Sequence, residues 1–370
     1  MTARRKARPS ESPRRAFSRV GVMRRRAAAA PRWCQGAYTG AMNVSEEIAA
    51  APLDPIPGED FCQTTGPTEA GLLTQQFLAF NTVITLQAFG PEAAVRAAFD
   101  AARAQCRVYE RLFSRTLEHS DIARLNGAGG QPVAVHEETA ILIEAALGYC
   151  AASEGLFDIT IGKAVGLWNF RDGQVADANR LREAMGHVDW RGVHVKRADD
   201  GAVAWLDDPR AALDLGGIAK GWIADELTVL LVRQGVSTFV VNLGGNVVAH
   251  GLKPDGAPWK VGLQNPFERG AVVGAVALSD ASAVTSGTYE RGFEKDGVRY
   301  HHILDPRTGF PVETDAAGVT VIARRSIDAE GFSTTLLAMG IERGLAFACM
   351  RPEILNAYFV DNQKRIYSLD

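Results

Sequence analysis

The chain has 370 residues, of which 46% are hydrophobic and 22% charged, so it is long and apolar enough for one large globular domain or two ordinary ones and is not a wholly disordered chain. It contains no uncharged apolar run of about 18 residues, so the sequence predicts no transmembrane helix. The net charge of −3 is unevenly distributed: residues 1–42 carry +10 and the remaining 328 residues carry −13, which argues against nucleic-acid binding by the acidic body.

Residues 1–70 are predicted to be a disordered basic extension, because Arg, Ala, Ser and Pro dominate much of the stretch. Residues 12–22 faintly resemble a twin-arginine export signal, but three arginines at 24–26 interrupt the apolar stretch that such a signal requires. The five cysteines are scattered and include no CxxC, which argues against a disulfide framework or a zinc site. The cysteines and the extension favour a cytoplasmic location.

The folded part is predicted to begin near Leu72. Residues 80–90 alternate between apolar and polar side chains, as a half-buried strand does. Residues 91–113 carry apolar side chains at helical spacing, Ser120 is a suitable cap for a short helix, and Glu137–Ala152 is a second amphipathic helix.

The second half of the chain alternates between strands and helices. Between residues 193 and 261, strands and glycine turns surround one helix, Ala219–Arg233. Strands are predicted at 274–278 and 318–323, helices between 329 and 349, and a last strand at 357–360. No repeat or linker interrupts residues 72–370, so this part of the chain is interpreted as one compact mixed α/β unit.

The segment 212–227 is interpreted as a strand, a glycine pair and a helix. Backbone N–H groups at such a turn can hold a phosphate, with Asp214 at the end of the strand and Lys220 in the first helical turn. The segment is not a Walker A loop, because Trp222 stands where the lysine is required. Taken alone, it is equally a tight turn followed by a solvated lysine.

A second glycine pair, Gly244 and Gly245, lies within the apolar run 240–251. Glycines inside a strand pattern indicate a bulge or the close approach of a ligand. A plain hairpin turn is the alternative.

The segment 300–312 contains His302 and Asp305 at the entrance to a turn. Histidine is the usual proton acceptor near neutral pH, and a nearby carboxylate can orient it. The alternative is a histidine that is hydrogen-bonded at a turn.

The segment 326–340 is predicted to be a helix capped by Ser326. Glu330 and Thr334 are four residues apart and therefore share a face, with Ser333 beside them, whereas Asp328 points elsewhere. A carboxylate and a hydroxyl on one face suit a hard cation such as Mg²⁺. A solvated helix start is the alternative.

Read in order, seven segments resemble the ApbE family, the FAD:protein FMN transferases. They are GLFDITIGKAVGLWNF, ALDLGGIAKGWIADEL, VNLGGNVVAHG, PWKVGLQNP, VTSGTYERGF, HHILDPRTGFPV and AEGFSTTLLAMG. The resemblance covers about residues 77–370, and it identifies residues 71–370 as an ApbE-like flavin transferase domain.

The resemblance implies an α+β domain with a mainly antiparallel sheet and packed helices, which binds FAD and Mg²⁺. It implies transfer of the FMN half of FAD onto a Thr hydroxyl of a target flavoprotein, with release of AMP. His302 matches the family histidine that is proposed to act in transfer. The positions that match the family's FAD contacts are Leu156, Phe157, Asp158, Asp214, Lys220 and Ile303. Those that match its metal ligands are Gly217, through its carbonyl, Glu330 and Thr334.

Three places differ from the family's pattern. Phe80-Asn81-Thr82 stands where members usually have Met-Gly-Thr, Thr116 stands where they have a tyrosine beside the flavin, and Glu330 stands where they have aspartate. An FAD pyrophosphatase that releases FMN and AMP, or a flavin-binding protein without catalysis, are alternatives for the same site. The family resemblance suggests a different location from the cytoplasm, the periplasmic face of the inner membrane.

Overall fold

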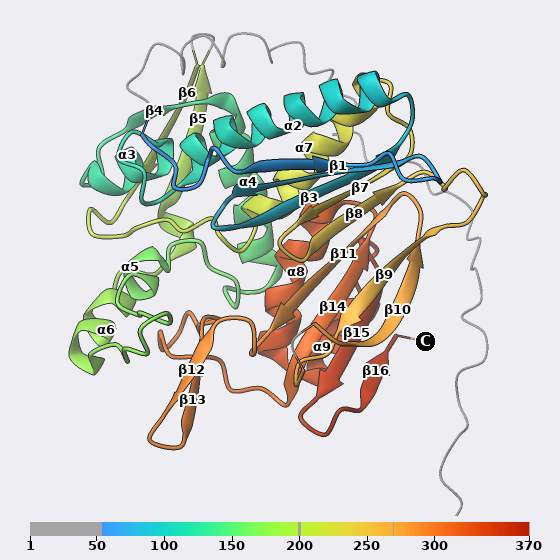
Figure 1. Ribbon diagram of the computed structural model, residues 1–370. Helices are drawn as coiled ribbons and strands as arrows, with labels where there is room; N and C mark the ends of the chain where they lie inside the picture. Colours follow the sequence, from blue (N-terminus) through green and yellow to red (C-terminus); the bar gives the residue numbers. More distant parts are fainter. Residues whose placement is uncertain (1–53, 199–200, 269, 370) are drawn as a thin grey trace, which may run out of the picture. The chain divides into compact units, whose positions relative to one another are not determined.

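The computed structural model describes residues 54–198, 201–268 and 270–369 (Figure 1). The chain divides into two units, Met1–Asn43 and Val44–Asp370, and the description concerns the second. Most of the predicted extension, including the export-signal resemblance, lies outside the described residues. None of the described helices is both long enough and apolar enough to cross a bilayer.

A nine-stranded sheet forms the centre of the described unit (Figure 1), and every pair of neighbouring strands in it is antiparallel. This confirms the predicted α+β fold with a mainly antiparallel sheet. In spatial order the strands are β1 (Cys62–Thr65), β2 (Leu72–Ala79), β3 (Thr82–Phe89), β7 (Phe239–Leu243), β8 (Asn246–His250), β11 (Ala281–Gly287), β14 (Ala316–Ala323), β15 (Ile354–Asp361) and β16 (Ile366–Ser368).

Helices pack on one face of this sheet because its strands alternate their side chains between two faces. Along β11, for example, Val284 packs with helix residues whereas Ala281 and Ala283 face the opposite side. The helices on this face are α2 (Glu92–Phe113), α7 (Ala219–Arg233), α8 (Ser326–Met339) and α9 (Ile341–Cys349). On the opposite face a separate hairpin supplies packing partners, formed by β9 (Trp259–Gln264) and β10 (Val272–Leu278).

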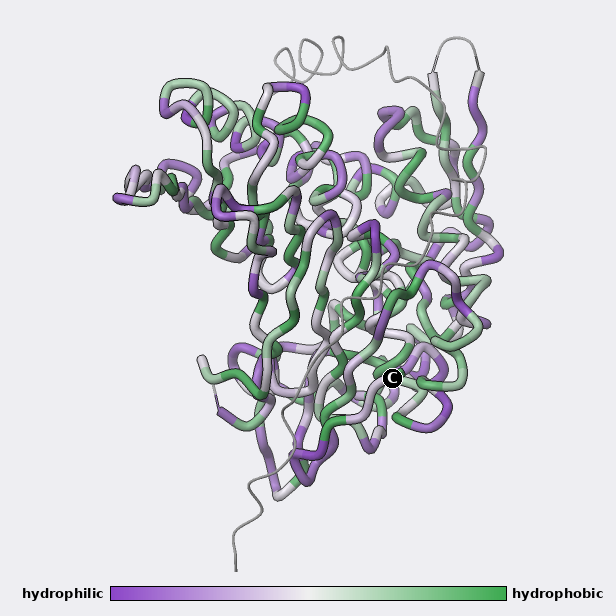
Figure 2. Tube along the Cα trace, turned by 90° about the vertical axis from the view of Figure 1, so that its right-hand side faces the viewer, coloured by the Kyte–Doolittle hydropathy of each residue, from purple (hydrophilic) through white to green (hydrophobic). Residues whose placement is uncertain are grey.

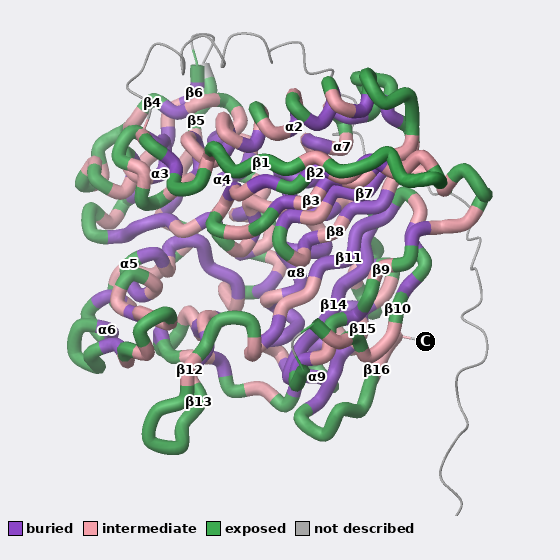
Figure 3. Tube along the Cα trace, in the orientation of Figure 1, coloured by how far each residue is buried: buried purple, intermediate pink, exposed green. Residues whose placement is uncertain are grey.

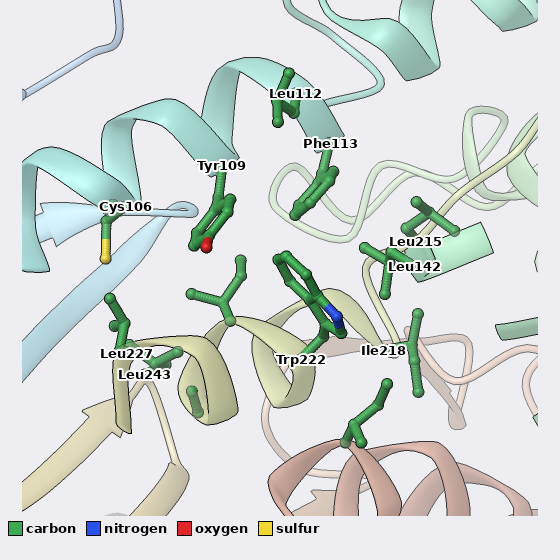
Figure 4. Packing of buried hydrophobic residues seen from close by; sticks show 14 of the residues in the cluster. Cys106, Tyr109, Leu112, Phe113, Leu142, Leu215, Ile218, Trp222, Leu227 and Leu243 are labelled. Atoms are coloured by element: carbon green, nitrogen blue, oxygen red, sulfur yellow. The ribbon is translucent and has the colours of Figure 1, made fainter. Parts of the chain in front are cut away.

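The helix layer and the sheet bury two apolar clusters between them, one with α2 and α7 and one with α8 and α9. Figure 3 shows the central strands buried and the outward side of α2 exposed, and Figure 2 shows hydrophobic residues recurring along the strands. Between α2 and α7, Trp222 points toward Tyr109 and Phe113 (Figure 4), with ring centroids 5.0 and 5.4 Å from the indole. Aromatic pairs in this edge-to-face arrangement fix one helix against the other.

The remaining described elements form smaller groups beside the sheet. One is a three-stranded sheet with its helices, and another is an isolated hairpin, β12–β13. Their bounds are α3 (Asp121–Gly127), β4 (Val133–Val135), α4 (Glu137–Ala152), α5 (Gly162–Val165), α6 (Ala178–Met185), η2 (Trp190–Gly192), β5 (Val193–Ala198), β6 (Gly201–Leu206), β12 (Gly292–Lys295) and β13 (Val298–His301).

The predicted helices are confirmed, and α4 and α7 have the predicted bounds. Ser120 caps α3 by accepting a hydrogen bond from the N–H of Ala123. The glycine pair at 244–245 forms the plain two-residue hairpin between β7 and β8, with both φ angles positive, as a type I′ turn requires.

Three predictions are wrong. Residues 54–70 are not part of a disordered extension, since β1 pairs with β2 and the side chain of Ile56 is buried. The segment before Gly216 is irregular, because only Ala212 makes a β-bridge, to Ile161. The strand at 357–360 is not the last, because β16 follows it and pairs with its outer edge.

Candidate functional site

Helices α7 and α8 touch at Gly221, where no side chain would fit. A Cβ added at Gly221 would lie 2.7 Å from the carbonyl oxygen of Ser326 and 3.0 Å from Cβ of Glu330. The N–H of Gly221 donates a hydrogen bond to Oε2 of Glu330. The close approach therefore places a buried carboxylate directly at the N-terminus of α7.

The second carboxylate oxygen of Glu330 is paired with the ammonium of Lys220. Oε1 of Glu330 accepts from Nζ of Lys220, which also donates to the carbonyl oxygen of Gly216 at 3.3 Å. Glu330 is only 4% exposed and the Lys220 side chain 27%, so this ion pair is partly shielded from water. The glycine turn and α8, which are far apart in the sequence, therefore meet around a cationic group.

Asp225 of α7 holds the N-terminus of α8. Its carboxylate accepts hydrogen bonds from the N–H groups of Ser326 at 2.7 Å and Ile327 at 3.0 Å. The prediction that Ser326 caps this helix is therefore wrong: its hydroxyl donates to Oδ1 of Asn246 instead. Burial raises the pKa of Asp225 to about 7.

Hydroxyl groups gather one turn further along α8. The hydroxyl of Ser286, near the end of β11, is 2.8 Å from that of Ser333 and 3.4 Å from that of Thr334. Asp328 is not part of this group, because its Oδ1 accepts a hydrogen bond of 2.5 Å from the hydroxyl of Tyr149, which lies on α4. The predicted separation of Asp328 from Thr334 is thus confirmed.

Asp214 shapes the glycine turn before α7. Its Oδ1 accepts the N–H of Gly216 at 2.8 Å, and its Oδ2 lies 3.0 Å from Nε of Arg115. A Cβ added at Gly217 would lie 3.0 Å from Cε2 of Phe157. The predicted FAD-contact positions Asp214 and Phe157 therefore border the same turn as Lys220.

The other predicted FAD-contact positions are held by packing or by local hydrogen bonds. The carboxylate of Asp158 accepts from the N–H and hydroxyl of Thr160, at 2.8 and 2.6 Å, and from the N–H of Trp190 at 3.3 Å. Burial raises its pKa. Leu156 is half-buried, and Ile303 is buried in the core cluster that includes α8.

His302 follows β13 at the base of the β12–β13 hairpin. Its backbone N–H donates to the carbonyl oxygen of Arg291 at 3.0 Å. Its ring Nδ1 is buried and has no hydrogen-bond partner among the described residues. Burial lowers the pKa of His302 to about 4, and the charge of Arg291 adds to the effect, as does that of Lys220. The imidazole is therefore neutral at pH 7, and its buried Nδ1 has no partner among the described residues.

Asp305 does not orient His302. Its carboxylate instead accepts from Nε of Arg307 at 2.9 Å and from the N–H of the same residue at 2.8 Å. The three-residue spacing placed the two side chains near one turn, but the turn directs the carboxylate toward Arg307. This corrects the expected pairing.

The predicted metal ligands are of the chemical type that suits a hard cation. The described residues contain no group of three His, Cys, Asp or Glu that could hold a metal. The predicted ligands are instead one carboxylate, the Thr334 hydroxyl and the Gly217 carbonyl, all of them oxygen donors. Magnesium commonly binds one or two protein carboxylates and completes its shell with water and substrate phosphates. In this structure the ammonium of Lys220 occupies Oε1 of Glu330 and the N–H of Gly221 occupies Oε2, so a metal ion bound by this carboxylate would have to replace or share one of these partners.

Three contributors to this arrangement were not found from the sequence: Arg115, Asp225 and the close contact at Gly221. Each acts on a partner about one hundred residues away in the sequence, so no local pattern marks it. The available signals were weak: a glycine inside an otherwise strong helix pattern indicates close packing, and an acidic residue on an apolar helix needs a buried partner.

Known proteins share this fold and much of this sequence. A model of the ApbE family matches residues 80–359. The FAD:protein FMN transferase of Treponema pallidum (strain Nichols) is 38% identical over 293 residues, covering 75% of this chain and 80% of that protein. The FAD:protein FMN transferase of Klebsiella pneumoniae (strain 342) is 37% identical over 262 residues, covering 70% and 80% respectively.

Solved structures agree. The ApbE protein of Thermotoga maritima superimposes with a TM-score of 0.72 at 28% identity, covering 82% of this chain and 96% of that one. The flavinyl transferase ApbE of Pseudomonas stutzeri, in its apo form, gives a TM-score of 0.66 at 29% identity, covering 83% and 93%. Fold and sequence together define an enzyme of the transferase class. The chain belongs to the ApbE family.

Proposed function

We propose that this protein is an FAD:protein FMN transferase that requires Mg²⁺, attaches FMN to a Thr hydroxyl of a target flavoprotein and releases AMP. The observation that carries the proposal is the meeting of the glycine turn and α8 around Lys220 and Glu330, with a neutral His302 near enough for the Lys220 charge to affect its pKa. The names of the relatives and the seven ordered segments support the same reaction.

The reaction replaces a phosphoanhydride bond of FAD with a phosphoester bond to the acceptor. The Thr hydroxyl oxygen forms a bond to the phosphorus of the FMN half, the bond from that phosphorus to the bridging diphosphate oxygen breaks, and the bridging oxygen leaves with AMP. The hydroxyl proton must be removed as the new bond forms. When bound, Mg²⁺ would neutralise phosphate charge, and Glu330, Thr334 and the carbonyl of Gly217 would hold it.

The residues of the chain have distinct roles in this proposal. His302 accepts the hydroxyl proton, because its ring is neutral at pH 7 and its buried Nδ1 lacks a partner among the described residues. Phe157, Asp214 and Lys220 position FAD at the glycine turn, together with Leu156, Asp158 and Ile303. The buried Glu330 keeps Lys220 close to the turn.

Incubation of the purified protein with FAD, Mg²⁺ and a candidate acceptor flavoprotein tests the proposal. We expect a fluorescent acceptor band in a denaturing gel and an added FMN by mass spectrometry, both lost when the acceptor's threonine is changed to alanine and when EDTA replaces Mg²⁺. Chromatography of the small molecules should show one AMP for each FMN attached.

Other outcomes of the same experiment would contradict the proposal. Free FMN accumulating with AMP, without any labelled acceptor, would identify an FAD pyrophosphatase. FAD that binds and stays intact for hours with Mg²⁺ would identify a flavin-binding protein without catalysis.

A further inference from the structure

Arg115 reaches the glycine turn from a different part of the chain. It lies in the turn after α2, and its Nε is 3.0 Å from Oδ2 of Asp214. The Arg115 side chain is 38% exposed, against 17% for Asp214. The guanidinium therefore lies at the glycine turn, and part of the Arg115 side chain is exposed to solvent.

The backbone around Arg115 is held firmly. The hydroxyl of Ser114 accepts hydrogen bonds from the N–H groups of Thr116 at 3.2 Å and Leu117 at 3.1 Å. The hydroxyls of Ser114 and Thr116 share a further hydrogen bond of 3.1 Å. Such a serine turn limits the positions that the Arg115 side chain can take, and a preorganised group loses less entropy when it binds.

The guanidinium of Arg115 has more N–H donors than its ion pair with Asp214 uses. It carries five N–H donors in a planar fork, and the ion pair with Asp214 engages Nε. The two terminal nitrogens of Arg115 make no hydrogen bond to any residue within 54–198, 201–268 and 270–369. The other cation at this turn, Lys220, is already occupied by Glu330 and the carbonyl of Gly216.

We propose that Arg115 binds the diphosphate of FAD and makes the site discriminate phosphorylated flavins from riboflavin. This deepens the proposed function and rests on it. A guanidinium fork binds phosphate oxygens in pairs, and the ligand brings negative charge to a turn whose own carboxylate, Asp214, already has partners.

Binding of a graded set of ligands tests the role of Arg115. Dissociation constants are measured with Mg²⁺ present for FAD, FMN, riboflavin, ADP and adenosine, on the wild-type protein and on R115Q and R115K. Arg96→Gln is the matched control, because Arg96 is 39% exposed and pairs with Glu92 on the outside of α2. Circular dichroism and thermal unfolding check that each variant is folded.

We expect R115Q to weaken FAD and ADP binding about 10- to 100-fold and to change riboflavin and adenosine binding less than about twofold. R115K, which keeps the charge and loses the fork, should fall between wild type and R115Q. The control R96Q should bind all five ligands as the wild type does.

Two results would overturn the role of Arg115: unchanged FAD binding in R115Q, or an equal loss for riboflavin and FAD, which would indicate stacking or a structural ion pair. If R115Q does not fold, R115K tests the proposal in its place. Loss of the guanidinium fork alone should still weaken the binding of FAD relative to the binding of riboflavin. Wild-type protein that binds FAD with the expected selectivity but labels no acceptor would contradict the proposed transfer and leave the role of Arg115 intact.

Discussion

The contact between α7 and α8 and the loop that carries His302 are built in opposite ways. At the helix contact both carboxylate oxygens of Glu330 have partners, and Asp225 satisfies the N-terminus of α8. In the His302 loop, a buried ring nitrogen has none among the described residues. A satisfied polar network stabilises the fold, whereas an unpaired buried group costs free energy unless a ligand completes it.

We therefore expect the α7–α8 contact to contribute to the stability of the fold, and the His302 loop to contribute to substrate binding and catalysis. Substitutions at the helix contact should therefore change stability together with activity. Substitutions in the His302 loop should change activity with little loss of stability. The predictions that follow test this separation, from the largest expected effect to the smallest.

The largest effect is expected at His302. Replacing it with asparagine should slow acceptor labelling about 10²- to 10⁴-fold, because the proposed proton acceptor is lost, while FAD binding and thermal stability change little. Because the wild-type pKa is about 4, labelling by the wild type should not fall between pH 7 and pH 5 through protonation of His302. The rate is followed by in-gel fluorescence at saturating FAD.

His194→Asn is the matched control for His302, because His194 is an exposed histidine paired with Asp207 outside the candidate site. It should label acceptor at the wild-type rate. Wild-type labelling in H302N, or a loss of labelling that merely follows a loss of folded protein, would remove His302 from catalysis.

Glu330→Gln should destabilise the helix contact by about 3 kcal/mol, because it leaves the partly buried Lys220 ammonium without its counter-charge. Urea unfolding measures the change, and calorimetry with Mg²⁺ should show weaker metal binding. Glu144→Gln is the control: Glu144 pairs with Arg197 on the surface, where an ion pair contributes less than about 1 kcal/mol. Equal stability of E330Q and wild type would show that the pair does not hold the helices together.

Asp225→Asn should alter the pH dependence of stability. The pKa of Asp225 is raised from 3.8 to about 7 by burial, with Arg325 lowering and Asp328 raising it, so the folded state binds a proton that the unfolded state has lost between these pH values. The Asp225 contribution in the wild type therefore weakens as pH rises from about 4 to about 7. The amide that replaces the carboxyl group in D225N does not titrate.

The stability of D225N relative to wild type should accordingly improve over that pH interval, by roughly 3 kcal/mol, and then stay level. Urea unfolding at several pH values measures it. A difference that is constant from about pH 4 to about pH 8 would contradict a raised pKa at Asp225.

Local patterns were sufficient for much of the fold. Helices α4 and α7 have the predicted bounds because apolar spacing and helix ends are set by nearby residues. The spacing of Glu330 and Thr334 likewise placed a carboxylate and a hydroxyl on one helix face. The prediction that Ser326 caps α8 was wrong because it used the local sequence alone. Serine is a good helix cap, but Asp225 of another helix accepts the hydrogen bonds at that end of α8.

What the sequence could not supply was the pairing between distant segments. Nothing near Lys220 in the sequence indicates that its ammonium meets Glu330, and nothing near Arg115 indicates Asp214. Such contacts depend on how α7 and α8 dock on the sheet. The family resemblance placed ligands on both segments, but it did not reveal the charges that hold them together.

The smallest effect is expected at Gly221, and it tests the helix contact without changing any charge. Alanine is normally the better helix former by about 1 kcal/mol, so Gly→Ala in an open helical position should stabilise the protein. Gly148 of α4 is such a position, because a Cβ there would meet nothing within 4 Å. At Gly221 the added methyl would meet the carbonyl oxygen of Ser326 at 2.7 Å, so G221A should instead lose about 1 to 3 kcal/mol of stability as α7 and α8 move apart.

The same separation would withdraw the N–H of Gly221 from Glu330, so acceptor labelling should fall in G221A and stay unchanged in G148A. If both variants gain stability, α7 and α8 tolerate separation, and the contact between them does not hold this part of the candidate site rigid.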